Sequence, residues 1–220
     1  MRPKADKNSF PPPVTGEVVR RTGGGIFAAL ALLGLAASAS AGWRDEASAR
    51  DIERLSHLSA SRAQGMQEAA AGNPADFAAI QSILQSGAAP ASPSALKGTW
   101  RCRSMKLGGV SPEIVYSWFR CRISEKDGAL FFEKLSGSQR TSGYLYPEGE
   151  GYVYLGASYM ASYGPPEKTP AYSGSGQSAG AADTPDDQIG LLSQLYDGRL
   201  RIEFPYPVQE STFDVIELKR

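Results

Sequence analysis

The two cysteines of this chain are each flanked by a pair of arginines, an arrangement that could bind an anion. The motif Arg-Cys-Arg occurs twice, at residues 101–103 and 120–122. Guanidinium groups bind phosphate and carboxylate groups through two parallel hydrogen bonds. With the basic and aromatic residues nearby, the candidate ligand-binding set is Arg101, Arg103, Arg120, Arg122, Arg140, Tyr116 and Trp118.

The sequence contains few other residues in patterns typical of catalysis or metal binding. The sequence has no metal-ligand spacing of histidines and cysteines, no phosphate-binding loop and no Gly-x-Ser-x-Gly motif. The single histidine, His57, lies among serines in a helical stretch and is expected at the surface. Glu148 and Glu150 flank a glycine in a predicted turn, so we expect solvated acids. The polar turn 137–140 has donors suited to an anion, although a plain turn is expected. An enzyme that uses these carboxylates or the turn at Gln139 and Arg140 is a third hypothesis, behind two binding functions. We therefore predict no catalytic residue, no metal and no cofactor.

The composition limits the classes of protein to which this chain could belong. The 220 residues are 41% hydrophobic and 21% charged, which suits one folded domain. The net charge is zero, but basic residues are in excess within 1–41, so the remainder is mildly acidic. Nucleic-acid binding depends on neutralising phosphates, so we expect no nucleic-acid partner.

The first 41 residues have the features of an export signal. Arg20 and Arg21 precede an apolar run over 25–37, and Ala39-Ser40-Ala41 has the small-x-small form of a cleavage site. The run is shorter than the roughly 20 residues that span a bilayer, and no cysteine follows to accept a lipid. We predict a signal peptide with an N-terminal extension over 1–41, cleaved before Gly42. The mature protein would be periplasmic or secreted, without a transmembrane segment, and the arginine pair leaves the twin-arginine route open.

Residues 42–94 are expected to form helices and a linker. Apolar residues recur at helical spacing from Trp43 to about Gln85, and Gly72-Asn73-Pro74 divides the stretch into two helices. Asn73 would cap the second helix and Pro74 would occupy its first turn. Both helices are expected to pack on the following domain, although the alanine-rich stripe could also face a membrane or a partner.

From residue 95 to 220 the periodicity changes to two, which predicts strands. We place them at 97–105, 113–124, 129–135, 139–146, 150–159, 188–196, 199–204 and 211–219. Eight strands joined mostly by short turns predict a mainly β fold, an antiparallel up-and-down barrel preceded by two helices. A barrel of this size is filled by its own side chains or holds one small ligand. The long loop at 164–187 would be flexible or would form a lid, with nearby tyrosines at the mouth: Tyr152, Tyr154, Tyr159, Tyr163 and Tyr172.

The predicted barrel resembles a known superfamily at three residues, Gly98, Trp100 and Arg220. A Gly-x-Trp step begins the first strand, and a basic residue ends the last one. This pattern resembles the calycin or lipocalin superfamily, in which the tryptophan closes the barrel base beneath the basic side chain. The motifs at 98–103, 106–109, 118–123, 137–140 and 154–156 also resemble DUF4893, a family of exported bacterial proteins. That resemblance covers about residues 43–218 and implies no activity.

Two cysteines in an exported chain usually pair, so we predict a disulfide between Cys102 and Cys121 on adjacent strands. If the cysteines face each other, Arg101 lies opposite Arg122 and Arg103 opposite Arg120. Like charges in such positions repel unless a negative group lies among them.

Two sources of negative charge remain open. Carboxylates of neighbouring strands, Glu133 and Glu217, could neutralise the arginines. Alternatively, the arginines could form an anion site with Lys106 and Arg140, for a ligand with an apolar or aromatic body.

Two functions from different classes fit this architecture. The first is a monomeric periplasmic carrier whose barrel holds a small apolar or anionic amphipathic molecule, which requires a cavity of at least about 300 Å³. The second is a protein-interaction module of the cell envelope, an inhibitor or assembly factor, with a filled barrel and an exposed aromatic patch.

Overall fold

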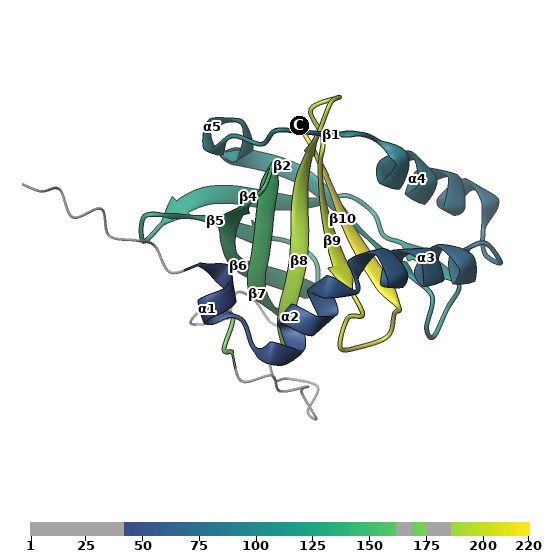
Figure 1. Ribbon diagram of the computed structural model, residues 1–220. Helices are drawn as coiled ribbons and strands as arrows, with labels where there is room; N and C mark the ends of the chain where they lie inside the picture. The colour runs from purple at the N-terminus through teal and green to yellow at the C-terminus, as the bar shows by residue number, and fades with distance from the viewer. Residues whose placement is uncertain (1–41, 162–168, 175–185) are drawn as a thin grey trace, which may run out of the picture. The chain divides into compact units, whose positions relative to one another are not determined.

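Eight antiparallel strands close into a barrel (Figure 1). The computed structural model describes residues 42–161, 169–174 and 186–220. The barrel strands are β2 (Gly98–Leu107), β4 (Phe119–Lys126), β5 (Ala129–Lys134), β6 (Gln139–Glu148), β7 (Gly151–Met160), β8 (Asp186–Leu195), β9 (Leu200–Pro205) and β10 (Phe213–Lys219). Neighbours in the chain pair in turn, and β10 closes the ring on β2. The predicted fold class is confirmed.

Two short strands lie outside this ring. The predicted strand 113–124 is wrong as one element, because it is divided into β3 (Glu113–Val115) and β4. β3 pairs the end of β2 and β4 pairs its beginning, while the amide of Tyr116 donates to the Ser104 carbonyl between them. A further pair of residues, β1 (Ala88–Ala89), lies against the end of β8.

The helical region is divided more finely than expected. It contains α1 (Trp43–Glu46), α2 (Ala49–Ser56), α3 (Leu58–Ala69), α4 (Pro74–Gln85) and α5 (Pro93–Leu96). The prediction of one helix up to residue 72 was wrong, because Ser48 caps a new helix by accepting from the Asp51 amide and the chain turns again at His57. The cap at Asn73 is confirmed, since its side chain accepts from the amides of Ala75 and Asp76.

The helices pack on the outside of the barrel. In Figure 1, α2 and α3 lie across β8 and β9. Apolar outer-face residues of β2 and β10 join helix residues in one buried cluster that includes Leu107, Phe213 and Ile80. Gly65 of α3 permits the closest approach, because a Cβ there would lie 2.7 Å from the Cβ of Phe213. In the described part of the chain, no helix is long and apolar enough to span a bilayer.

The long loop is described only in part. Tyr172 donates from its hydroxyl to Asp51 at 2.5 Å and packs with the cluster beneath α1 and α2, on the outside of the barrel. The predicted mouth position of Tyr172 is therefore wrong. Tyr163 and most of the expected lid or flexible loop lie outside the described residues, as does the predicted signal peptide.

Candidate functional site

One end of the barrel is closed by Trp100. Its indole is 2% exposed, and Nε1 donates to the Leu96 carbonyl at 2.9 Å. The guanidinium of Arg220 lies 4.4 Å from the ring centre and donates to the carbonyls of Ala95 and Lys97. Gly98 has a φ of 139°, a conformation that favours glycine, and it brings the backbone close to Arg220. The structure thus places a tryptophan and a basic residue together at the base.

The disulfide between Cys102 and Cys121 is confirmed. Both residues are fully buried inside the barrel, with Cα atoms 5.8 Å apart. The cysteines lie diagonally, however, because Cys102 pairs with Phe119 and Cys121 pairs with Trp100. The shift by two residues leaves every side chain on its expected face of the sheet.

The register corrects the arrangement of the arginines. The predicted pairs of Arg101 with Arg122 and of Arg103 with Arg120 were wrong. Arg101 pairs with Arg120 instead, and Arg122 pairs with Thr99. The break between β3 and β4 sets this register, and the sequence alone does not reveal it.

The two expected carboxylates neutralise two of the four arginines. Arg103 donates to Glu217 at 2.6 Å, and Arg122 donates to Glu133 at 2.7 Å. These contacts lie on the outer face of the barrel, where Trp118 also lies against Arg103. The predicted ligand-binding set is therefore not one site, since Arg140 lies apart from it at the barrel mouth.

Breaking the disulfide should cost substantial stability. The bridge closes a sequence separation of 19 residues, and chain-entropy arguments assign such a loop about 3 kcal/mol. Removal of both cysteines (Cys102→Ala/Cys121→Ala) should lower the melting temperature by about 6 to 12 °C. Titration of the unreduced, denatured protein should detect no free thiol, and two reactive thiols per chain would contradict the assignment.

The barrel mouth contains a cavity of about 140 Å³ that is lined by both polar and apolar side chains. Near the base the inward-facing positions are apolar, whereas toward the mouth they become polar or charged. The polar lining residues include Ser104, Lys106, Lys134, Gln139, Thr141, Ser158, Asp186, Gln188 and Asp214. Most of these were missed by the sequence interpretation. The available signal was the change from apolar to polar residues along the inward side of each strand.

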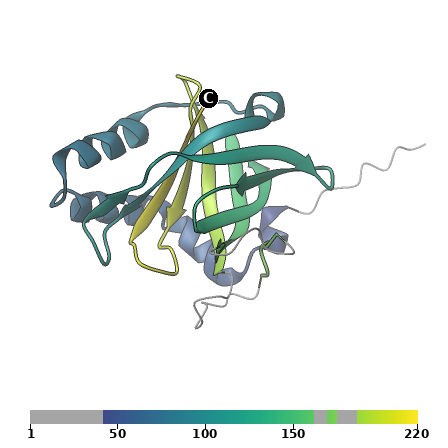
Figure 2. The same ribbon diagram turned by 180° about the vertical axis from the view of Figure 1, so that it is seen from behind.

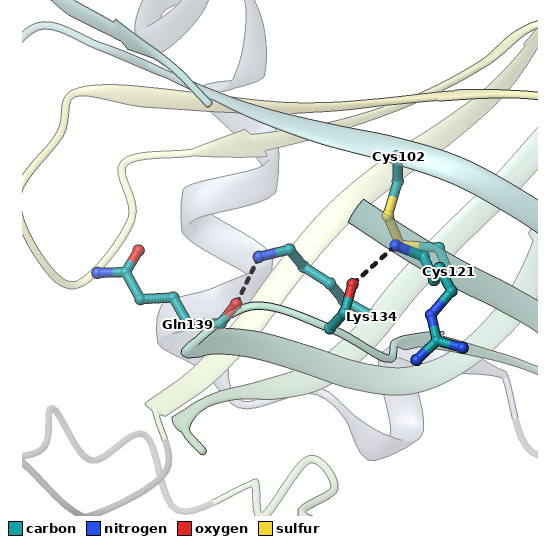
Figure 3. The surroundings of a disulfide bond; sticks show 6 residues. Cys102, Cys121, Lys134 and Gln139 are labelled. Carbon is teal, nitrogen blue, oxygen red and sulfur yellow. Dashed lines mark hydrogen bonds between the residues drawn. A yellow bond between two sulfur atoms is a disulfide. The ribbon is translucent and has the colours of Figure 1, made fainter. Parts of the chain in front are cut away.

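Lys134 is the unusual cation of this cavity. It is 5% exposed, and its Nζ donates to the Gln139 carbonyl at 2.5 Å (Figure 3). Its Nζ also lies 4.1 Å from the centre of the Phe119 ring. Among the described residues, no carboxylate lies within ion-pair distance of it. Burial, together with the positive charges of Arg140 and Lys106, lowers the pKa of Lys134 to about 8.

The other lysine of the cavity lining is paired with a carboxylate. Lys106 forms an ion pair with Glu210, and Ser211 Oγ donates to Asp214 at 2.5 Å. Burial alone would lower the pKa of Lys106, but the carboxylates of Asp214 and Glu210 outweigh it and the pKa is raised. Burial raises the pKa of Asp214 to about 6, against the opposing effect of Lys106.

Hydrogen bonds hold the other polar side chains around the cavity in place. Gln209 Nε2 donates to Asp186 at 2.6 Å, and the hydroxyls of Thr141 and Tyr154 lie 2.6 Å apart at the cavity floor. Burial raises the pKa of Tyr154, which stays neutral. At the rim, Arg140 donates to the Gly137 carbonyl at 3.0 Å. The described residues include no group of three or more side chains that could hold a metal ion.

A closed antiparallel barrel with a tryptophan and an arginine together at one end and a cavity at the other resembles the calycin architecture. Residues 43–218 match the family described as a domain of unknown function, DUF4893, and the chain belongs to that family. A search of curated proteins and a search of solved structures each found no match.

Proposed function

We propose that this protein binds a small anionic molecule in the mouth of its barrel. The observation that supports this proposal most strongly is Lys134, a buried ammonium with no carboxylate partner among the described residues. Buried charges are costly unless they are paired. Lys106 and Arg140 both lie near enough to lower the pKa of Lys134. Because Lys106 is already paired with Glu210, Arg140 at the rim is the second positive charge that an anion could contact.

The cavity volume restricts the ligand. About 140 Å³ is less than the roughly 300 Å³ at the lower end of pockets that enclose drug-sized ligands. The cavity therefore suits a carboxylate or phosphate group better than a whole apolar molecule. The apolar part of an amphipathic ligand would lie at the rim, beside Met160 and Pro207. This supports the anionic amphipathic class over the purely apolar one.

We further propose that the protein acts outside the cytoplasm. The disulfide supports this, because disulfides persist mainly in oxidising compartments. The apolar run at 25–37 and the small residues at 39–41 support cleavage before Gly42. Residue-specific proteolysis and mass spectrometry of the exported protein would establish its first residue.

Replacement of Lys134 by methionine should separate binding from stability. Lys134→Met removes the cation that would contact the anion, so affinity for phosphate or octanoate should fall about 10- to 100-fold. The same change removes a charge that burial disfavours, so the melting temperature at pH 7 should rise. Titration calorimetry and thermal denaturation measure the two effects.

Lys126→Met is the matched control, because Lys126 also lies over an aromatic ring, 4.3 Å from that of Phe131, but is exposed and outside the cavity. It should bind the two anions like the wild type. Equal loss of binding in both lysine variants, or unchanged binding in Lys134→Met, would exclude the cavity as the site.

Binding should also depend on pH in two steps. Lys134 loses its charge as the pH rises through about 8, so affinity for an anion should fall there. Asp214 becomes neutral as the pH falls through about 6, which removes a repelling charge and should raise affinity. Titrations of octanoate across both ranges test this. In Asp214→Asn the step near pH 6 should be absent and the step near 8 should persist.

A second candidate is a protein-interaction module. Its support is the apolar side chains that fill the barrel toward the base, together with the small cavity. Native mass spectrometry of protein purified from its own periplasm distinguishes the two functions. A retained molecule of a few hundred daltons or less would favour the carrier, whereas a retained polypeptide would favour the module.

A further inference from the structure

Three cations occupy neighbouring positions on the outer face of three adjacent strands. Lys219 of β10 pairs with Arg101 of β2, and Arg101 pairs with Arg120 of β4. Side chains in such positions begin roughly 5 Å apart. We call Lys219, Arg101 and Arg120 the cation row.

The cation row differs from the charges beside it. The neighbouring arginines of β2 and β4 form ion pairs with Glu217 and Glu133. Within the described ranges, no carboxylate lies at ion-pair distance from any member of the row. Arg101 and Arg120 are exposed. Three adjacent like charges disfavour the folded sheet, so the row is not explained by stability.

An aromatic side chain accompanies the row. Lys219 lies 4.2 Å and Arg101 lies 5.5 Å from the ring centre of Trp118, which is half-buried. The ring attracts the cations and holds their charged groups on the outer face. An indole bordered by basic groups suits the headgroup level of a bilayer, where tryptophan is enriched.

The row lies near the base of the barrel, beyond the part of the outer face of β2 and β10 that the helices cover. Figure 2 shows β2 and β4, in teal, on the side turned away from α2 and α3. Cys102 and Cys121, each adjacent in sequence to an arginine of the row, form the disulfide inside the barrel. The bridge therefore fixes the spacing between the two strands that carry Arg101 and Arg120.

We infer that the cation row docks on the phosphate headgroups of an anionic lipid surface. Guanidinium groups bind phosphates bidentately, and a row across a sheet can contact several headgroups at once. Residues 42–220 carry a small excess of acidic over basic residues, so the attraction to an anionic surface depends on this local cluster. The inference is independent of the proposed cavity ligand, because the row lies on the outer face.

Co-sedimentation with vesicles tests the docking site. The purified protein should bind vesicles that contain phosphatidylglycerol, should not bind pure phosphatidylcholine vesicles, and should dissociate as salt is added. The double variant Arg101→Ala/Arg120→Ala should bind these vesicles about 25-fold more weakly than the wild type. Each cation removed near an anionic surface lowers the affinity about fivefold, and two are removed. Unchanged binding by this variant would overturn the inference.

The control removes two exposed arginines that already have partners. Arg44→Ala/Arg122→Ala changes the net charge equally, but Arg44 and Arg122 pair with Glu148 and Glu133. It should bind vesicles within about twofold of the wild type, since paired charges attract a surface weakly. An equal loss in both double variants would show a general charge effect and overturn the site.

A charge reversal excludes misfolding as the cause of lost binding. In Arg120→Glu, a carboxylate would lie opposite Arg101, so the melting temperature should rise while vesicle binding is lost. A lower melting temperature would show that Arg120 is structural. Wild-type protein that binds poly-glutamate but not anionic vesicles would replace the lipid with an acidic protein partner.

Discussion

Replacement of Trp100 by alanine is expected to lower the free energy of unfolding by about 3 to 5 kcal/mol. The indole is 2% exposed and fills the base of the barrel, so its removal leaves a large cavity. The substitution also removes the hydrogen bond to the Leu96 carbonyl and the ring beneath Arg220. Since a domain has only about 5 to 15 kcal/mol of stability, much of the variant would be unfolded on mild heating.

Urea unfolding followed by circular dichroism measures this loss. Trp118→Ala provides the control, because Trp118 is half-buried on the outer face and its removal should cost less. Trp100 lies at the end of the barrel opposite the mouth cavity and does not line it. A variant that kept its stability but lost phosphate binding would contradict the structural role.

The barrel could be predicted because its evidence is local. Alternation of inward and outward residues identifies each strand, and glycine-containing turns such as the one at Gly128 separate them. The pairing of Cys102 with Cys121 likewise follows from cysteine number alone. The strand containing Arg101 was placed correctly for the same reason.

The register and the cavity could not be predicted, because they depend on how separate strands meet. A shift of two residues conserves the face of every side chain, so the pattern does not distinguish Arg120 from Arg122 as the partner of Arg101. Lys134 is an ordinary residue of a strand in the sequence. The turn between β5 and β6 places it beside Arg140, and the packing of β2, β4 and β5 brings it near Lys106.

The helical region was predicted, but its division into separate helices was not. Helical periodicity continues through Ser48 and His57, whereas the backbone leaves helical geometry at both positions. The buried charges that attach the helices, among them Glu203, occur in a strand without any distinguishing motif.

Removal of the Glu203 carboxylate is also expected to lower the free energy of unfolding strongly. Glu203 of β9 is fully buried and lies within ion-pair distance of Arg62 of α3, at 2.5 Å, and of Arg201, at 2.8 Å. Neither oxygen has a partner in hydrogen-bond geometry, so the attraction is mainly that of opposite charges in a low-dielectric environment. Glu203→Ala leaves the buried Arg201 without its counter-charge, which should cost about 3 to 5 kcal/mol.

A double replacement tests the cause of this loss. Replacing both partners (Arg201→Met/Glu203→Leu) removes the buried charges together, so this variant should be more stable than Glu203→Ala. It should not fully recover, because Arg201 also donates to the carbonyls of Ile83 and Leu84 at the end of α4.

The exposed pair of Arg122 and Glu133 provides the comparison for Glu203. Its arginine side chain is 50% exposed, so Glu133→Ala should cost less than about 1 kcal/mol, and added salt should reduce the difference further. Salt should have little influence on the loss in Glu203→Ala, because the buried carboxylate is shielded from ions. Equal losses in urea unfolding for Glu133→Ala and Glu203→Ala would show that burial does not strengthen the contact of Glu203, and that α3 and α4 are held on the barrel by their apolar residues alone.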